Sequence, residues 1–288
     1  MQIKKQFINS IFFIFLSFPI AENNDNYYSI NQIIEYADYL FGNEEYQMAI
    51  GEYQRALYLV DNNVKKIELK NNIADCYKQL GKIEMSISLV KSMISESKQN
   101  DVIYRLRYKL AQLYFEIENY FLSEKYLNQN ILTIQDSELL IKNQLLLAAT
   151  YILQNQINRA TSILNSELLI KNPISKQLSD LIQKKNEMNK KNPHFAAMLS
   201  ALIPGAGKVY SKNINDGLYS MFSVLGTGYV THNEIKKGNT KTLKFFTFCI
   251  ISTTFYLGNI YGSYIESHLY NKRKQQELII KIKKSLEV

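Results

Sequence analysis

The chain has 288 residues, of which 46% are hydrophobic and 21% charged, and its formal net charge is +8. This composition excludes a natively disordered chain, and the length allows about two domains. Only four prolines and eleven glycines occur, which favours helices over a turn-rich β protein. The lysines are densest beside apolar segments, a pattern that suits a membrane surface better than a nucleic-acid groove. We therefore expect no nucleic acid as a partner.

The first 21 residues are typical of a secretory signal peptide. Lys4 and Lys5 form a basic start, residues 8–18 are mostly apolar, and Ala21 offers a cleavage site. The apolar run is too short to cross a hydrocarbon core of about 30 Å, which favours a removed signal over an anchor. Pro19 stands where a small residue is preferred, so an uncleaved anchor stays open as the alternative.

An internal repeat with a period of 37 residues runs from residue 29 to residue 172. Two of its columns hold small residues, and two hold mostly bulky ones. The columns are Ala37, Ala74, Ala111 and Ala148; Ala49, Ser86, Ser123 and Ala160; Leu40, Tyr77, Tyr114 and Tyr151; and Tyr46, Ile83, Tyr120 and Ile157. Small residues at these points let two antiparallel helices approach closely, and the bulky ones fill the space between stacked pairs. The pattern predicts four helical hairpins.

These columns resemble the tetratricopeptide repeat, a helix-turn-helix unit of about 34 residues. Each copy here has about three more residues, which we expect in the turns between copies, as at residues 61–63. The resemblance implies an α-solenoid whose concave face, lined by the first helix of each copy, binds a protein or peptide segment. The residues that it places on this face are Asn71, Asp75, Lys78 and Gln79 of the second copy and Arg105, Tyr108 and Gln112 of the third.

Residues 173–193 are predicted to close the repeats with a capping helix and a linker. Ile174, Leu178, Leu181 and Ile182 lie on one helical face, as in the terminal helix that a solenoid needs. The lysine-rich residues 184–191 then form a charged linker.

The apolar segments between residues 194 and 265 predict a small helical membrane domain. Residues 245–265 carry no charged side chain and are long enough to cross a membrane, and residues 217–233 are a shorter second candidate. Residues 195–210 are interrupted by Pro204 and Gly205, so we expect a half-span or an interfacial segment. Gly258 and Gly262 form a GxxxG pair, which would let another helix pack closely.

Two spans would place the lysine-rich loop between them in the cytoplasm, as the positive-inside rule requires. The repeats would then lie outside the cytoplasm, in the periplasm if the bacterium has two membranes, with the protein in the inner membrane. If residues 195–214 also cross, the loop and the tail exchange sides. We expect two spans because the Pro204–Lys208 segment makes a poor third.

The last residues, 266–288, are predicted to form a basic amphipathic tail helix. One side of this helix is apolar and carries Leu278, Ile279, Ile282 and Leu286. Such a helix could lie in the lipid headgroup layer, and a solvated tail is the alternative.

Short motifs in the apolar region resemble a second family, a bacterial membrane domain without an assigned activity. Its marks are P-G-x-G-x-x-Y, an Asp-Gly pair and G-N-I-Y-G-S, and its members commonly carry a signal peptide and helical repeats before it. The matching residues are Pro204, Gly205, Gly207, Tyr210, Asp216, Gly217, Gly258, Asn259 and Gly262, whereas Lys208 stands where glutamine is commoner. We expect a tight turn at Pro204 and helix-to-helix hydrogen bonds from Asn259, because backbone and amide groups at membrane depth need partners.

No catalytic or metal-binding set is apparent from the spacing of residues. The Gly207-Lys208 pair lacks the other glycine and the Ser or Thr of a P-loop, which excludes nucleotide binding. Cys76 and Cys249 lie in different kinds of segment, so neither a disulfide, a Cys-rich metal site nor a cofactor is expected. Asp75 and Lys78 have the spacing of an ordinary i, i+3 surface pair on one helix.

The sequence therefore predicts a membrane-tethered, non-enzymatic scaffold with two partners, a protein segment in the repeat groove and the lipid bilayer. The alternative is a regulatory or accessory subunit of a membrane transporter, or a membrane-embedded enzyme. That alternative would need polar groups within the spans, for which the sequence offers Asn259, Lys208 and His232.

Overall fold

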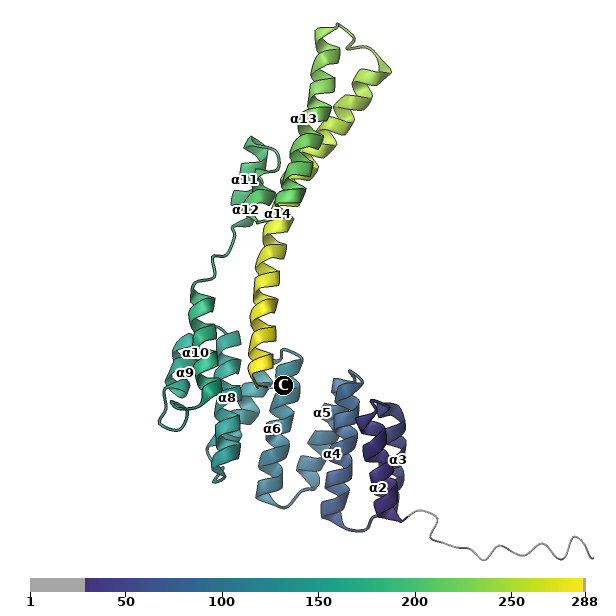
Figure 1. Cartoon of the computed structure of the whole chain (residues 1–288), viewed down its shortest axis with the longest axis vertical. Helices are drawn as coiled ribbons and strands as arrows, with labels where there is room; N and C mark the ends of the chain where they lie inside the picture. Colours follow the sequence, from purple (N-terminus) through teal and green to yellow (C-terminus); the bar gives the residue numbers. More distant parts are fainter. Residues whose placement is uncertain (1–28, 287–288) are drawn as a thin grey trace, which may run out of the picture. The chain divides into compact units, whose positions relative to one another are not determined.

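The computed structural model describes residues 29–286, so the signal peptide predicted for residues 1–21 lies outside the described residues. The described part holds thirteen α-helices and no β-strand (Figure 1). The helices are α2 Ile30–Gly42, α3 Tyr46–Leu59, α4 Asn63–Gln79, α5 Ile83–Glu96, α6 Asn100–Glu116, α7 Tyr120–Ile131, α8 Ser137–Leu153, α9 Ile157–Leu164, α10 Pro173–Asn186, α11 Pro193–Leu202, α12 Ala206–Tyr210, α13 Ile214–Lys236 and α14 Leu243–Leu286. From α2 to α6, and again from α7 to α10, each helix packs on the next, which confirms the predicted all-α solenoid.

The 37-residue period is visible in the backbone. The second helix of each copy begins at Tyr46, Ile83, Tyr120 and Ile157. The turn before each start contains one residue with a positive φ: Glu44 at 64°, Gly81 at 70°, Glu118 at 62° and Asn155 at 65°. This left-handed residue reverses the chain after the first helix, and glycine adopts the conformation without steric cost. The turn therefore repeats together with the core.

The two columns of small residues lie where the helices of one copy cross. All eight side chains in these columns are fully buried. In the second copy the Ser86 hydroxyl donates a hydrogen bond of 2.8 Å to the carbonyl oxygen of Ala74, so the two columns touch. A larger residue in either column would push the two helices apart.

The described residues divide into two compact units, 29–118 and 119–286. The first unit contains α2–α6, with an apolar core that includes Ile33, Leu69 and Ile73. Asn62 caps α4 by accepting hydrogen bonds from the backbone N–H groups of Val64 and Lys65. The turn expected at residues 61–63 lies at residues 60–62 instead, because Asn63 already belongs to α4.

The second unit contains the last repeat helices, α10 and the α11–α14 region. Asn172 caps α10, and the apolar side of α10 is buried at Leu178, Leu181 and Ile182. The end of α14 packs on α10 and α8, which buries Leu278, Ile279 and Ile282. The apolar side of the tail, which was expected in the headgroup layer or in water, is thus covered within this unit. The physical reason is the removal of three aliphatic side chains from water.

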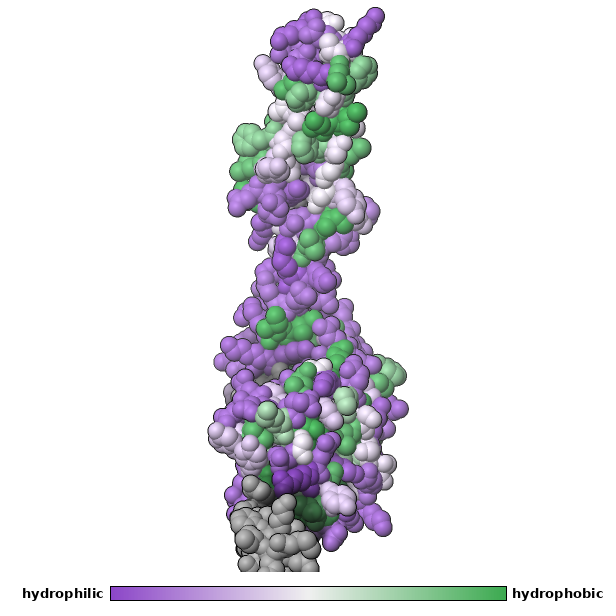
Figure 2. Space-filling model, turned by 90° about the vertical axis from the view of Figure 1, so that its right-hand side faces the viewer, coloured by the Kyte–Doolittle hydropathy of each residue, from purple (hydrophilic) through white to green (hydrophobic). Residues whose placement is uncertain are grey.

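α13 and α14 form an antiparallel hairpin with most of its large apolar side chains facing outward. Figure 2 shows these hydrophobic side chains gathered over the hairpin, with hydrophilic side chains at its end. Within residues 29–286, α14 is the one helix long and apolar enough to cross a membrane, and only 6% of its most apolar stretch is buried. α13 has 23 residues but contains no stretch as apolar as the one in α14.

Candidate functional site

The first helices of the second and third copies, α4 and α6, carry a polar network around Lys109. Its ammonium Nζ lies 2.7 Å from Asp75 Oδ1 and 2.7 Å from Asn71 Oδ1, and it also donates to the Asn71 carbonyl oxygen at 3.2 Å. The Lys109 side chain is only 15% exposed. Burial lowers the pKa of Lys109, while the neighbouring Asp75 carboxylate acts in the opposite direction. The network thus replaces the water that this ammonium has lost.

Two further contacts extend the network along the same two helices. Lys78 Nζ lies 3.3 Å from Glu116 Oε2, and Gln112 Nε2 donates to the Tyr108 hydroxyl at 3.4 Å. Burial raises the pKa of Tyr108 to about 12. Of the seven residues that the sequence places on this face, five are half-buried, and Gln79 and Arg105 are exposed.

The prediction of an Asp75–Lys78 pair along one helix is wrong. Each side chain instead pairs across to α6, Asp75 with Lys109 and Lys78 with Glu116. Lys109 is not recognisable from the sequence as part of this face, because it lies next to Tyr108 and therefore points about 100° away around the helix. Only its long, flexible side chain allows the ammonium to return to Asp75.

The α11–α12 turn brings three glycines against backbone or side-chain atoms. Gly205 has a φ of 85°, and a Cβ atom added there would lie 2.0 Å from the Gly217 carbonyl oxygen. A Cβ on Gly207 would lie 1.9 Å from the Ala196 carbonyl oxygen, and one on Gly217 would lie 2.6 Å from Val209 Cγ2. No side chain fits at such distances. The motif after Pro204 is therefore a close approach of α11, α12 and α13.

A stripe of four polar side chains on α14, spaced four residues apart, holds this turn. Asn259 accepts from the Gly205 N–H at 2.8 Å and donates to the Ser200 carbonyl oxygen at 2.9 Å. Ser263 Oγ lies 2.7 Å from Ser200 Oγ, and Ser267 Oγ lies 2.6 Å from Ser211 Oγ. The fourth residue, Asn271, exchanges two hydrogen bonds of 2.9 and 2.8 Å with the backbone of Lys191.

These contacts make residues 192–211 a segment that runs along α14 and then turns back. The segment begins beside Asn271, turns beside Asn259 and ends beside Ser267. The twelve residues from Asn259 to Asn271 span about 18 Å of helix, roughly half the thickness of a hydrocarbon core. The Tyr210 hydroxyl closes the segment by accepting from the Asn192 N–H at 3.2 Å.

The remaining motif residues have structural contacts. Asn213 caps α13 and donates to the Asp216 carboxylate at 2.9 Å. A Cβ on Gly262 would lie 3.3 Å from Lys208 Cε, whereas Gly258 has nothing within 4 Å. Gly262 of the GxxxG pair therefore packs against the Lys208 side chain, and no other helix packs against Gly258. Lys208 Nζ itself donates to Ser220 Oγ at 2.8 Å.

The histidines and cysteines do not gather into a site. The rings of His194 and His268 pack on Tyr264 at centroid distances of 5.3 and 4.8 Å, and His232 is exposed on α13. Cys76 and Cys249 are both free thiols. Across residues 29–286, no group of three or more His, Cys, Asp or Glu side chains could hold a metal ion.

Comparisons with known proteins add little to these contacts. No family model matches the chain. No curated protein matches it either. Among solved structures it is similar to the apo form of RapI, with 15% sequence identity, a TM-score of 0.45, and coverage of 88% of this chain and 87% of RapI. So low a likeness transfers neither a function nor a site to this chain.

Proposed function

We propose that the protein is a membrane-tethered, non-enzymatic scaffold that binds a protein or peptide segment on the first helices of its repeats. The observation that carries this proposal is the network around Lys109, which joins Asn71 and Asp75 of α4 to α6. Side chains that are fixed before binding lose little conformational entropy when a partner arrives. The network therefore suits recognition of a polar segment.

The chemistry of this face favours a peptide that carries both charge signs. Glu116 and Asp75 supply acceptors, and Lys78 supplies a cation that is still 27% exposed. Tyr108 adds an aromatic side chain, a residue type that is enriched at binding hot spots. Exposed Gln79 and Arg105 would lie at the ends of the contact.

We propose that α13 and α14 cross the membrane and that residues 192–211 re-enter it from the side of the repeats. Support comes from the length of α14, its exposed apolar surface and the return of the segment to Ser267. The lysine-rich loop before α14 would then be cytoplasmic, and the repeats and the tail would be periplasmic, in a bacterial inner membrane.

The polar groups that a transporter subunit or membrane enzyme would need are already engaged. The Asn259 side chain bonds to two backbone groups, and Lys208 bonds to Ser220. His232 lies exposed on α13 rather than inside the hairpin. These contacts favour the non-enzymatic function over that alternative.

Site-specific photocrosslinking in cells tests the binding face. A photoreactive residue at Arg105 or Gln79 is expected to give one discrete adduct, and the adduct should disappear when Asp75→Lys is added. The matched control is Tyr58 of α3, whose side chain is 90% exposed and lies on a second helix. The same adducts from Tyr58, or adducts insensitive to Asp75→Lys, would contradict the proposed face.

A further inference from the structure

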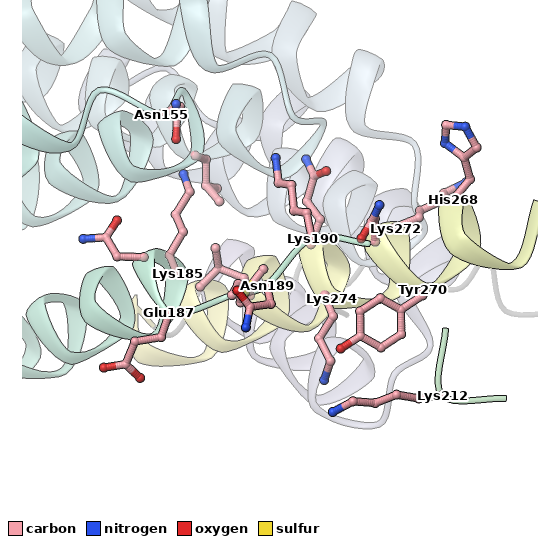
Figure 3. A pocket seen from close by; sticks show the side chains of 16 residues that line it. Asn155, Lys185, Glu187, Asn189, Lys190, Lys212, His268, Tyr270, Lys272 and Lys274 are labelled. Carbon is pink, nitrogen blue, oxygen red and sulfur yellow. The ribbon is translucent and has the colours of Figure 1, made fainter. Parts of the chain in front are cut away.

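A large basic cavity lies in the second unit, next to residues 192–211. Its volume is about 1030 Å³, and its wall comes from the end of α8, the linker after α10, the turn after α12 and residues 268–278 of α14 (Figure 3). Five lysines line it: Lys185, Lys190, Lys212, Lys272 and Lys274. Glu187 is the one carboxylate in the same wall. The cavity therefore has a strong excess of positive charge.

Three of these lysines have no ion-pair partner within residues 29–286. Lys274 pairs with Glu277 at 2.8 Å, and the ammonium of Lys185 donates to the Ile152 carbonyl oxygen. Lys190, Lys212 and Lys272 have no such contact in that part of the chain. The pKa of Lys185 is lowered first by burial and then by the charge of Lys190. Like charges thus crowd the cavity, and a bound anion would relieve their repulsion.

The remaining wall residues favour an anion that also has hydroxyl groups. Asn155, Asn189 and Gln275 supply amide donors and acceptors, and Tyr270 supplies a phenol. A phosphate accepts several hydrogen bonds at once from lysines, and a polyol matches amide groups. The cavity volume exceeds what one inorganic ion needs and falls within the range of organic ligands.

We propose that this cavity binds a phosphate ester of a polyol, supplied by the headgroup of an anionic phospholipid. The location supports the lipid source, because His268 in the wall lies only three residues beyond the predicted span 245–265. Lysines close to a membrane surface attract anionic headgroups over about a Debye length. The lipid source rests on the membrane attachment proposed above, whereas the phosphate chemistry does not.

Native mass spectrometry of the full chain in neutral detergent tests this site, with phosphatidylglycerol and phosphatidylcholine as probes. We expect phosphatidylglycerol adducts to be preferred, and the variant K190Q/K212Q/K272Q to bind that lipid on the order of 100-fold more weakly. The matched control is K236Q/K237Q/K241Q, which removes the same charge from the exposed end of α13 and the loop that follows it, and should bind as the unmodified chain does. Circular dichroism checks that both variants keep their helices.

Each result has a defined meaning. Equal loss in both triple variants would show nonspecific charge attraction and overturn the site, as would no loss in either. Competition by glycerol phosphate or inorganic phosphate at millimolar concentration, without a preference for phosphatidylglycerol, would retain the phosphate chemistry and overturn the lipid source. Failure of the membrane proposal would not remove binding of glycerol phosphate, so the two failures can be told apart.

Discussion

The repeats and the α11–α14 region bury opposite kinds of side chain. In the repeats, the fully buried positions are mostly apolar, such as Leu110 and Phe115. In the α11–α14 region, the fully buried positions are mostly serines, such as Ser200 and Ser263, while large apolar side chains face outward. The first pattern is driven by removal of apolar surface from water. The second suits a solvent that is itself apolar.

This difference shows which interactions determine the arrangement of the helices in each region. In the repeats, the size of the side chains determines how the helices pack. The two columns of small residues set the distance between helices that are otherwise held together by apolar contacts. Hydrogen bonds and glycine contacts specify the α11–α14 region, because in the proposed membrane apolar contacts alone would not distinguish one helix from another. Variants that alter one feature at a time can break or sharpen this comparison.

The largest effect is expected from Gly207→Ala. Its Cβ would lie 1.9 Å from the Ala196 carbonyl oxygen, a backbone atom that cannot move aside alone. We expect a loss of about 3 kcal/mol or more in unfolding free energy, or failure of α11 to dock. Thermal unfolding in detergent followed by circular dichroism measures it. Gly258→Ala is the control, since nothing lies within 4 Å of it, and alanine should stabilise the helix slightly. Equal behaviour of the two variants would contradict the close approach.

Asn259→Leu is expected to have the next largest effect. It leaves the Gly205 N–H and the Ser200 carbonyl group without their partner in the closed turn. Two unsatisfied backbone groups cost about 2–4 kcal/mol in total. Thr254→Leu on the same helix is the control, because the Thr254 hydroxyl bonds only to the Ile250 carbonyl oxygen one turn earlier. The same thermal measurement should show little change for Thr254→Leu, and a comparable loss there would remove the argument for the stripe.

The raised pKa of Tyr108 predicts a loss of folding stability at alkaline pH. Its pKa is about 12 in the folded chain against 10.0 ordinarily, so between these values the folded state binds more protons than the unfolded state. Stability therefore falls as pH rises from about 10 to 12, by about 2–3 kcal/mol for this group. Burial also raises the pKa of Tyr53, and that of Cys76 to about 11, which adds to the fall. Tyr108→Phe should flatten the profile between pH 10 and 12, and an unchanged profile would contradict the burial of Tyr108.

The smallest effect is expected from Lys109→Met. The variant removes the shared partner of Asp75 and Asn71, but Asp75 is 38% exposed and can regain water. We expect a loss of about 1–2 kcal/mol. The control is Lys142→Met, which breaks a pair with Glu138 in which both side chains are more than half exposed and should change stability by less than about 0.5 kcal/mol. Thermal unfolding compares the two, and equal losses would mean that the Lys109 network is an ordinary surface pair.

The sequence allowed more of the repeats to be predicted than of the α11–α14 region. The start of a helix at Ile83 and the burial of Ala111 both follow from the 37-residue period, because equivalent residues recur in all four copies. Asn259 was also recognisable, because an amide is conspicuous in an apolar run. The pairing of Ser200 with Ser263 was not, because serines are common and their partners lie 63 residues apart. The contact of Lys109 with Asp75 was not predictable either, because it depends on how the long lysine side chain folds back along the helix.

Cysteine accessibility in intact cells tests the central claim, that the α13–α14 hairpin crosses the membrane while residues 192–211 only re-enter it. Cys76 and Cys249 are replaced by alanine, and single cysteines are placed at Asn189, Asn239 and Ser285. An impermeant thiol reagent added from outside should label Asn189 and Ser285 and spare Asn239 until the membrane is opened. Labelling of Asn189 and Ser285 from opposite sides would show that residues 192–211 cross completely, and labelling of all three positions from outside would show that the hairpin does not cross.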